Sequence, residues 1–507
     1  MNYIKICIYI TSLFLLVSCS GVPDTSTDRD TLPPLSPDIA EVTIPVNIAP
    51  INFRLTEPVS RLVAVFKGSS GNMTIRGKDK ILIPARKWHK LLEENSGGKM
   101  LITLFAKTEG EWVRYKPFNI NVKETPIDRG LVYRLIAPGY ESWSEMGIYQ
   151  RDLTSFKETP VIDNRLLPGN CMNCHSFNNN DPEQMMFHLR GNIGGTMLVK
   201  DGTITRLNTK TDETISNCVY PYWHPSGNYI AYSVNLISQV FHTVNTKRIE
   251  VMDSESDVVV YDINANKLIT TKLISSEESF ETFPSFTPDG KTLIFCSAGK
   301  GVLPDDYDSI KYSLCKISFD PSDGTFGTKI DTLVSSYSTG KSISFPRPSH
   351  DGKFIMFTMS DYGNFSIWHK EADLYLLDLS TGTYKNMTAV NSDDTESYHS
   401  WSSGSQWFVF SSRRINSLYT MPYIAWLDEN GEATKPFLLP QKDPDHYDNS
   451  LRSFNIPEFV NGEIAVTGRK MLNTIGSEAK NVTFELKDRF FYAEGIFYLS
   501  SAEGRED

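Results

Sequence analysis

The stretch "FPSFTPDGKTLIFCS", from Phe283 to Ser297, combines an aromatic lead-in, a Pro-Asp-Gly turn and an alternating apolar run. Proline and glycine favour the backbone angles of a tight turn. Alternation of apolar and polar residues is typical of a strand with one buried face. The stretch therefore predicts an incoming strand, a turn and a second strand.

The same pattern recurs along the chain. Further copies begin at Tyr220 ("YPYWHPSGNYIAYS"), Phe345 ("FPRPSHDGKFIMFTM") and Tyr398 ("YHSWSSGSQWFVFSS"), with a weaker copy at Ile456 ("IPEFVNGEIAVTG"). Equivalent positions of the first four copies lie 63, 62 and 53 residues apart. One such unit exposes both faces of its strands, whereas several units stacked around an axis bury them. The repeat predicts an all-β chain with a β-propeller over residues 196–507.

These segments resemble the TolB-type β-propeller repeat, whose signature runs Pro-x-Trp/Phe-Ser-Pro-Asp-Gly-Lys before a strand. "PSFTPDGKTLIF" matches it well and "SWSSGSQWFVF" is degenerate. Counting the copies gives five to six blades, and we predict six, with closure by a strand from around Met197 or from the C-terminus. The motifs of the repeat are specific for a fold, and a fold of this kind hosts many functions.

The first residues read as an export signal. Lys5 precedes the apolar run "ICIYITSLFLLV", which is short for a membrane span and fits a secretory leader. "LVSC" at the end of this run resembles a bacterial lipobox, which implies cleavage of residues 1–18 and lipidation of Cys19; the alternative is an ordinary signal peptide with a chance cysteine. Residues 19–39 are polar and proline-rich, and this composition predicts a flexible tether.

Two further regions precede the propeller. Residues 40–125 alternate in short segments and predict a β-sandwich-like domain, with one helix at "PARKWHKLLEEN" from Pro84. Residues 126–195 are rich in Pro, Gly and Asn, and predict an irregular connector.

Within that connector lies "CMNCHSF", which has the order Cys-x-x-Cys-His of a c-type haem attachment site. In this interpretation Cys171 and Cys174 bond the haem vinyl groups and His175 is the axial iron ligand. The distal-ligand candidates are His188, Met185 and Met186. Two alternatives stay open: a disulfide between the cysteines, and a metal site of Cys171, Cys174, His175 and His188.

"CMNCHSF" and "MMFHLRG" also resemble exported lipoproteins of Bacteroidetes that carry Cys-x-x-Cys-His ahead of a TolB-like propeller. This resemblance supports the architecture more than any chemistry. It implies an outer-membrane lipoprotein that faces the periplasm or the cell surface.

The sequence gives few other indications of catalysis or ligand binding. The chain lacks a Gly-x-Ser-x-Gly elbow, a phosphate-binding glycine loop and His-Glu-x-x-His, so no catalytic residue is predicted. His224, His350 and His399 lie in the repeat turns and are either a ring of imidazoles or solvated turn residues. Arg413, Arg414 and Arg452 are either anion contacts or members of surface salt bridges. Cys218, Cys296 and Cys315 read as buried inert thiols.

Three functions fit these observations. The first is a lipid-anchored propeller that binds an envelope protein or glycan, with haem as a redox or structural element. The second is an electron-transfer protein in which the propeller is a scaffold. The third is a haem-dependent periplasmic oxidoreductase. A net charge of −11 argues against a nucleic-acid partner.

Overall fold

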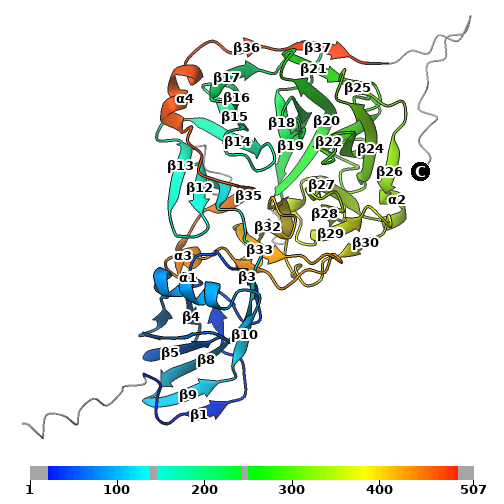
Figure 1. The fold of residues 1–507 in the computed structure, drawn as a ribbon. Coiled ribbons are helices and arrows are strands. Elements are labelled where there is room, and N and C mark those ends of the chain that lie inside the picture. Colours follow the sequence, from blue (N-terminus) through cyan, green and yellow to red (C-terminus); the bar gives the residue numbers. More distant parts are fainter. Residues whose placement is uncertain (1–20, 138–144, 243–248, 489–507) are drawn as a thin grey trace, which may run out of the picture. The chain divides into compact units, whose positions relative to one another are not determined.

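The computed structural model describes residues 21–137, 145–242 and 249–488, and it forms an all-β fold in two compact units (Figure 1). The first unit comprises residues 50–124 with the segments before 43 and from 440 to 446. The second comprises residues 125–439 with the segments 43–49 and after 446. The signal segment and Cys19 lie outside the described residues.

The first unit contains two sheets and one helix. A larger sheet joins β1, β9, β8 and β10, with β5 and β6 along the other edge of β8, and a smaller sheet has the order β2-β4-β7. The elements are β1 (Thr27–Arg29), β2 (Leu35–Ser36), β4 (Phe53–Leu55), β5 (Arg61–Lys67), β6 (Asn72–Gly77), β7 (Lys80–Ile81), α1 (Ala85–Glu94), β8 (Lys99–Thr108), β9 (Glu111–Tyr115) and β10 (Phe118–Lys123).

The predicted helix is confirmed as α1. Pro84 precedes its first residue, where a missing N–H costs nothing, and Trp88, Leu91 and Leu92 bury one face. The predicted tether is too long, because β1 and β2 already belong to the folded unit.

Two features hold that early segment in place. Strand β1 pairs in parallel with β9, and Asp28 accepts a 2.7 Å contact from Arg114. Leu35 and Ile39 are buried. Burial of these apolar side chains offsets the entropy of ordering the chain.

The second unit is built from six sheets of sequential antiparallel strands, drawn from cyan to orange in Figure 1. Their strands are, sheet by sheet: β11 (Gly130–Ile136), β12 (Gly147–Asp152), β13 (Glu158–Asp163) with β35 (Ser453–Val460); β14 (Asn170–Phe177), β15 (Met185–Gly191), β16 (Gly195–Lys200), β17 (Thr203–Asn208); β18 (Cys218–Trp223), β19 (Tyr229–Phe241), β20 (Ile249–Asp262), β21 (Lys267–Thr270); β22 (Ser279–Phe286), β23 (Thr292–Gly299), β24 (Ser313–Asp320), β25 (Thr325–Phe326), β26 (Asp331–Val334); β27 (Ser342–Pro348), β28 (Phe354–Ser360), β29 (Asp373–Asp378), β30 (Tyr384–Asn386); and β31 (Glu396–Trp401), β32 (Trp407–Ser412), β33 (Met421–Trp426), β34 (Phe437–Leu438).

The end of the described chain returns to earlier sheets. β35 pairs antiparallel with β11, so one sheet combines residues 130–163 with residues 453–460. β36 (Lys480–Asn481) and β37 (Thr483–Leu486) then add in parallel to β17 and β21. The other elements are β3 (Thr43–Pro45), α2 (Ser336–Thr339), η1 (Ser366–Trp368), α3 (His446–Asn449) and α4 (Gly468–Ile475).

Neighbouring sheets of this unit pack face to face through apolar side chains. Phe187 and Val199 pack against Ile148 and Val161 of the preceding sheet, and Met186 packs in a cluster with Trp223 of the following one. Strand β15 is apolar on both sides because Phe187 packs toward one neighbouring sheet and Met186 toward the other.

Residues 126–195 are therefore not a connector. They contain strands β11 to β15 and belong to the second unit. Their Pro, Gly and Asn residues lie in the tight turns between short strands, where these residues are favoured. Composition alone does not separate closely spaced turns from an irregular segment.

Candidate functional site

The first strand of each sheet, with β35 in that place in the sheet it shares with β11, is interrupted by a bulge. The strand register shifts there by one residue. A residue with positive φ stands at each bulge: Cys174 at 53°, Tyr220 at 50°, Phe283 at 50°, Phe345 at 53°, Tyr398 at 48° and Ile456 at 50°. Bulky residues rarely adopt this backbone region, so six occurrences at one structural position mark a shared constraint.

The residue after each bulge position explains part of that constraint. It is proline in four strands, and proline lacks the N–H needed to continue the ladder. In β14 and β31 it is His175 and His399 instead. The segment "CHSF" from Cys174 thus occupies the place of "YHSW" from Tyr398.

The Cys-x-x-Cys-His motif therefore includes a sixth copy of the repeat, which the sequence analysis missed. The signal was available: "HSF" at residues 175–177 matches "HSW" at residues 399–401. The haem interpretation uses this histidine only as the axial iron ligand.

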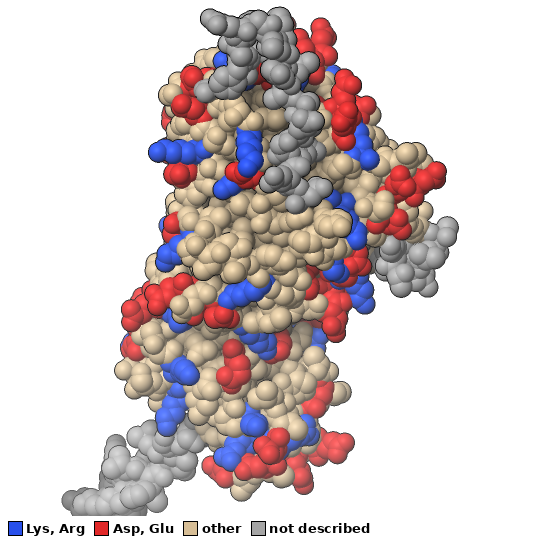
Figure 2. Space-filling view, turned by 90° about the vertical axis from the view of Figure 1, so that its right-hand side faces the viewer, with Lys and Arg blue, Asp and Glu red and all other residues tan. Residues whose placement is uncertain are grey.

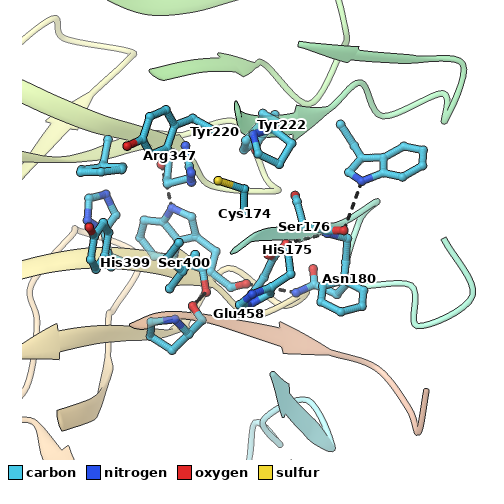
Figure 3. A pocket seen from close by; sticks show the side chains of 18 of the residues that line it. Cys174, His175, Ser176, Asn180, Tyr220, Tyr222, Arg347, His399, Ser400 and Glu458 are labelled. Carbon is cyan, nitrogen blue, oxygen red and sulfur yellow. Dashed lines mark hydrogen bonds between the residues drawn. The ribbon is translucent and has the colours of Figure 1, made fainter. Parts of the chain in front are cut away.

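Five of the six bulge residues, all but Phe283, line a cavity of about 80 Å³. Side chains of β14, β18, β27, β31 and β35 line it, and Figure 3 shows the labelled ones converging from these strands. Aromatic residues form much of the wall: Tyr220, Tyr222, Trp223, Phe345, Tyr398 and Trp401. Three histidines, Cys174, Arg347 and Glu458 add polar groups.

His175 is the least satisfied of these polar groups. It is 3% exposed, and neither ring nitrogen forms a hydrogen bond with any described residue. The backbone of Ile456 and Val132 lies close enough to favour the charged ring slightly, but without hydrogen-bond geometry. Burial, helped by the positive charge of Arg134, lowers the pKa of His175 to about 3. The ring is neutral, with one donor and one acceptor nitrogen.

His399 occupies the matching position in β31 and is partly satisfied. Its Nε2 lies 2.9 Å from the carbonyl oxygen of Met356, while Nδ1 has no partner among the described residues. Burial lowers the pKa of His399 to about 3. Donation to a carbonyl fixes the proton on Nε2, which leaves Nδ1 as an acceptor.

The interpretation of the repeat histidines as solvated turn residues is wrong for His224 and His399, which are 2% and 3% exposed. His350 also lines the cavity. His224 does not, and its ring nitrogens contact Ser226 Oγ at 2.8 Å and the Gly290 oxygen at 2.9 Å. The structure thus brings together two of the three, and adds His175.

Arg347 and Glu458 reach the same cavity from β27 and β35. The guanidinium of Arg347 donates to the Pro346 oxygen at 3.0 Å and lies over the Tyr222 ring at 5.2 Å. Glu458 accepts a hydrogen bond of 3.0 Å from the backbone N–H of Phe177. Burial raises the pKa of Glu458 to about 7, against smaller opposing effects of that hydrogen bond, of the charge of Arg347 and of a hydrogen bond from the Ser176 side chain.

The haem residues are not arranged for a porphyrin. Cys174 lines the cavity, but Cys171 does not; it pairs in register with Arg190. Both are buried thiols, so the structure contains no disulfide between them. A cavity of about 80 Å³ is far below the roughly 300 to 1,000 Å³ of sites for drug-sized ligands. The residues present do not fit a haem in this conformation.

The predicted distal ligands lie elsewhere. His188 Nδ1 is 3.1 Å from Thr196 Oγ1, and Met185 and Met186 are buried in apolar clusters. None of the three lines the cavity that His175 lines. Among the described residues, no group of three or more His, Cys, Asp or Glu side chains is placed to hold a metal ion, so Cys171, Cys174, His175 and His188 do not form one.

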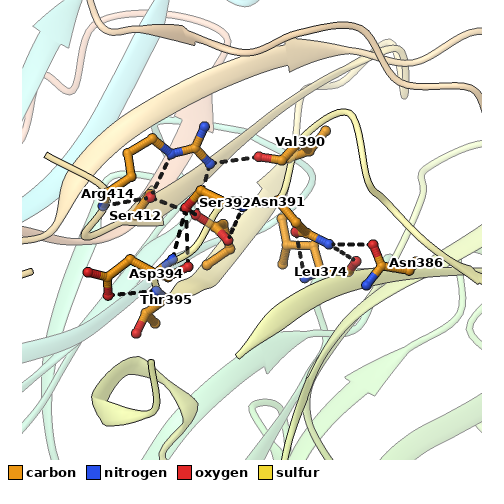
Figure 4. Close-up of polar contacts among 10 residues, drawn as sticks. Leu374, Asn386, Val390, Asn391, Ser392, Asp394, Thr395, Ser412 and Arg414 are labelled. Carbon is orange, nitrogen blue, oxygen red and sulfur yellow. Dashed lines mark hydrogen bonds and ion pairs between the residues drawn. The ribbon is translucent and has the colours of Figure 1, made fainter. Parts of the chain in front are cut away.

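The arginines that follow β32 and the arginine that precedes β35 have structural partners. Figure 4 shows Arg414, whose guanidinium lies 2.9 Å from a carboxylate oxygen of the fully buried Glu396. Ser392 and Ser412 donate to the same carboxylate at 2.6 and 2.8 Å. Arg413 lies over the Trp368 ring, and Arg452 pairs with Glu145 at 3.0 Å. The contact of Arg452 supports the surface salt-bridge interpretation, whereas that interpretation is wrong for Arg414, whose partner carboxylate is fully buried.

The remaining cysteines are buried in the second unit, and the surface carries side chains of both charges. Cys218, Cys296 and Cys315 are buried free thiols, as predicted, and burial raises the pKa of Cys218 to about 12. On the face drawn in Figure 2, basic side chains of the described residues lie singly among acidic ones. No helix in the described ranges is long and apolar enough to cross a membrane.

Comparisons with known proteins give distant fold likenesses only. No protein-family model matches the chain, and no curated protein matches it. Among solved structures, prolyl oligopeptidase B from Galerina marginata is 12% identical over 66% of this chain and 42% of its own, with a TM-score of 0.35. A DUF4784 family protein from Bacteroides caccae is 11% identical over 71% and 95%, with a TM-score of 0.29. An oligogalacturonate lyase in complex with manganese is 13% identical over 80% and 99%, with a TM-score of 0.31. The chain spans about two fifths of the oligopeptidase's length.

Proposed function

We propose that the chain is an exported, lipid-anchored protein with a six-bladed TolB-type propeller that binds a small molecule at the propeller axis. Six sheets with matching bulges support the blade number. Ring contacts between successive bulge residues support a closed ring: Tyr220 to Phe283 at 4.7 Å, Phe283 to Phe345 at 4.0 Å, and Phe345 to Tyr398 at 4.9 Å.

The main observation in support of a binding role is that the buried imidazole of His175 has no hydrogen bond. A buried polar side chain without a hydrogen bond costs about 1–3 kcal/mol, and proteins rarely retain one without a reason. An occupant of the cavity that contacts the imidazole would remove this cost. The half-buried cation of Arg347 and the carboxyl of Glu458 on the same cavity support the same conclusion.

Retention of a ligand tests this function. The protein is purified from its own cell envelope, and native mass spectrometry measures the mass that collision releases. Ser400 lines the cavity and donates to the Pro457 oxygen at 2.9 Å; Ser400→Leu fills the cavity and is expected to abolish the released mass. Ser338→Leu is the control, because exposed Ser338 makes a similar bond of 3.0 Å to the Ser335 oxygen outside the cavity. Equal retention by both variants, or none by the wild type, rejects the proposal.

Lipid anchoring rests on the sequence "LVSC". Cys19→Ala is expected to move the protein from the membrane fraction to the soluble fraction, and to remove acyl chains from the mass of the mature protein. An unchanged distribution would exclude lipidation at Cys19. Binding of an envelope protein or glycan stays a prediction of the sequence.

A covalently attached haem is the competing proposal. It requires the strands around Cys174 to open, since only Cys174 and His175 of its three residues line the cavity. Thiol titration of the unfolded protein separates the two. The structure has five free cysteines, Cys171, Cys174, Cys218, Cys296 and Cys315. Thioether bonds would consume two of them and leave three, with a Soret band in the intact protein.

A further inference from the structure

We propose that the axial cavity is a site for a small free α-amino acid, whose carboxylate contacts Arg347 and whose ammonium group contacts Glu458. This inference rests on the proposed binding function and names its ligand class. The argument starts from two opposite charges that share a cavity without neutralising each other.

No ion pair joins Arg347 to Glu458, both of which lie in the described part of the chain, although the charge of Arg347 favours the ionised form of Glu458. Arg347 has five N–H donors, and the one hydrogen bond given for its guanidinium is to the Pro346 oxygen. A buried pair that only stabilises the fold has its charges in contact, as Arg414 and Glu396 do at 2.9 Å. Arg347 and Glu458 are instead placed to receive the two charges of one ligand.

His175 supplies the second, independent observation. Its unpartnered imidazole is neutral and lines the same cavity, so one nitrogen can accept a hydrogen bond and the other can donate one. An ammonium group has three donors, more than one carboxylate satisfies. The acceptor nitrogens of His175 and His399 are available for the remaining donors.

The size and walls of the cavity limit the ligand further. At about 10–15 Å³ for each water-sized sphere, a cavity of about 80 Å³ holds roughly five to eight such spheres. Glycine, alanine and serine have a matching number of non-hydrogen atoms. A sugar ring or a porphyrin is larger. The aromatic walls favour a small apolar side chain over a charged one.

Among the titratable groups on the cavity, Glu458 is the one that changes charge near neutral pH. The pKa values of His175, His350 and His399 are lowered by burial, and those of Cys174, Tyr220, Tyr222 and Tyr398 are raised by it. With a pKa of about 7, Glu458 is mostly protonated at pH 6 and mostly ionised at pH 8. We expect affinity for an amino acid to rise by about tenfold over this interval.

Isothermal titration calorimetry on the purified protein tests the inference with glycine, L-alanine, acetate and methylammonium. The zwitterions are expected to bind, and the two singly charged compounds are expected to bind at least tenfold more weakly. Arg347→Met and Glu458→Gln should each weaken alanine binding at least tenfold, because one buried charge loses its partner. Arg452→Met removes an arginine outside the cavity and is expected to leave the affinity unchanged.

If a variant fails to fold, the binding measurements on the wild-type protein decide the outcome. Acetate that binds as tightly as alanine, or alanine that does not bind, overturns the inference. In either case a small molecule retained from the envelope and lost in Ser400→Leu would leave the proposed binding function intact. If nothing is retained, both fail.

Discussion

Two arginine–glutamate sets in the second unit differ in one respect. Arg414 and Glu396 are in contact at 2.9 Å, and two serines complete the hydrogen bonds of the carboxylate. Arg347 and Glu458 share a cavity without an ion pair. In the first set, the partners of both charged groups are residues of the chain. In the second set, N–H donors of Arg347, the carboxyl of Glu458 and the imidazole of His175 face the cavity. The comparison separates residues that hold the fold from residues that are placed for a ligand.

Arg414→Met gives the largest expected effect. It leaves the carboxyl of Glu396, which is fully buried, without its cation, and we expect a loss of about 3 kcal/mol in the free energy of unfolding. Urea unfolding followed by circular dichroism measures it. Arg347→Met is the matched variant, with an expected loss of about 1 kcal/mol or less, mainly from the contact with Tyr222. Equal losses would remove the distinction between the two sets.

Glu458→Gln changes the pH dependence of stability. Because the folded pKa of Glu458, about 7, lies above its unfolded value, its contribution is fully present below about pH 4.5 and is lost as pH rises through 7. The wild type should lose about 3 kcal/mol more than Glu458→Gln between pH 4.5 and 8. Urea midpoints across this range measure the difference. Parallel profiles for the two proteins would show that Glu458 is solvated in solution.

His175 and His399 occupy matching positions in β14 and β31, so they allow the same comparison at one structural position. His399→Phe leaves the Met356 oxygen without its donor and is expected to cost about 1–3 kcal/mol. His175→Phe breaks no hydrogen bond given by the structure and removes an unpartnered buried imidazole, so it is expected to stabilise the protein by about 1–3 kcal/mol. Thermal unfolding of both variants is the measurement. A large loss for His175→Phe would mean that the imidazole has a structural partner.

The smallest expected effect concerns the tether. Asp28→Asn weakens an exposed ion pair with Arg114, where the side chains are 66% and 47% exposed. Exposed pairs contribute about 0–1 kcal/mol, so the free energy of unfolding should change by less than about 0.5 kcal/mol. Proteolysis near residue 28 should be unchanged, because β1 stays paired with β9. Rapid cleavage there would show that the segment is a free tether as the composition predicted.

Much of the all-β architecture was predictable from local pattern. The repeat that begins at Phe283, with its proline, glycine and alternating strand, predicts sheets of sequential strands because turn chemistry and alternation act within a few residues. Helix α1 follows in the same way from Pro84 and the apolar face of Trp88 and Leu92. The connector prediction failed because turn-rich composition does not reveal which strands pair across a distance, as β35 does with β11.

The candidate site depended on tertiary structure. The sequence identified Cys174 and His175 as unusual, and its haem prediction used their spacing in one segment. Which side chains face them depends on residues up to 284 positions later in the chain, such as Glu458, and on the burial that sets the charge of Glu458 and His175. The spacing of Cys171, Cys174 and His175 was sufficient by itself to identify this segment as a candidate site. Only the folding of six sheets together decided that its histidine shares a cavity with Arg347 and Glu458, because contacts between distant strands and the loss of water around them arise only when the sheets pack.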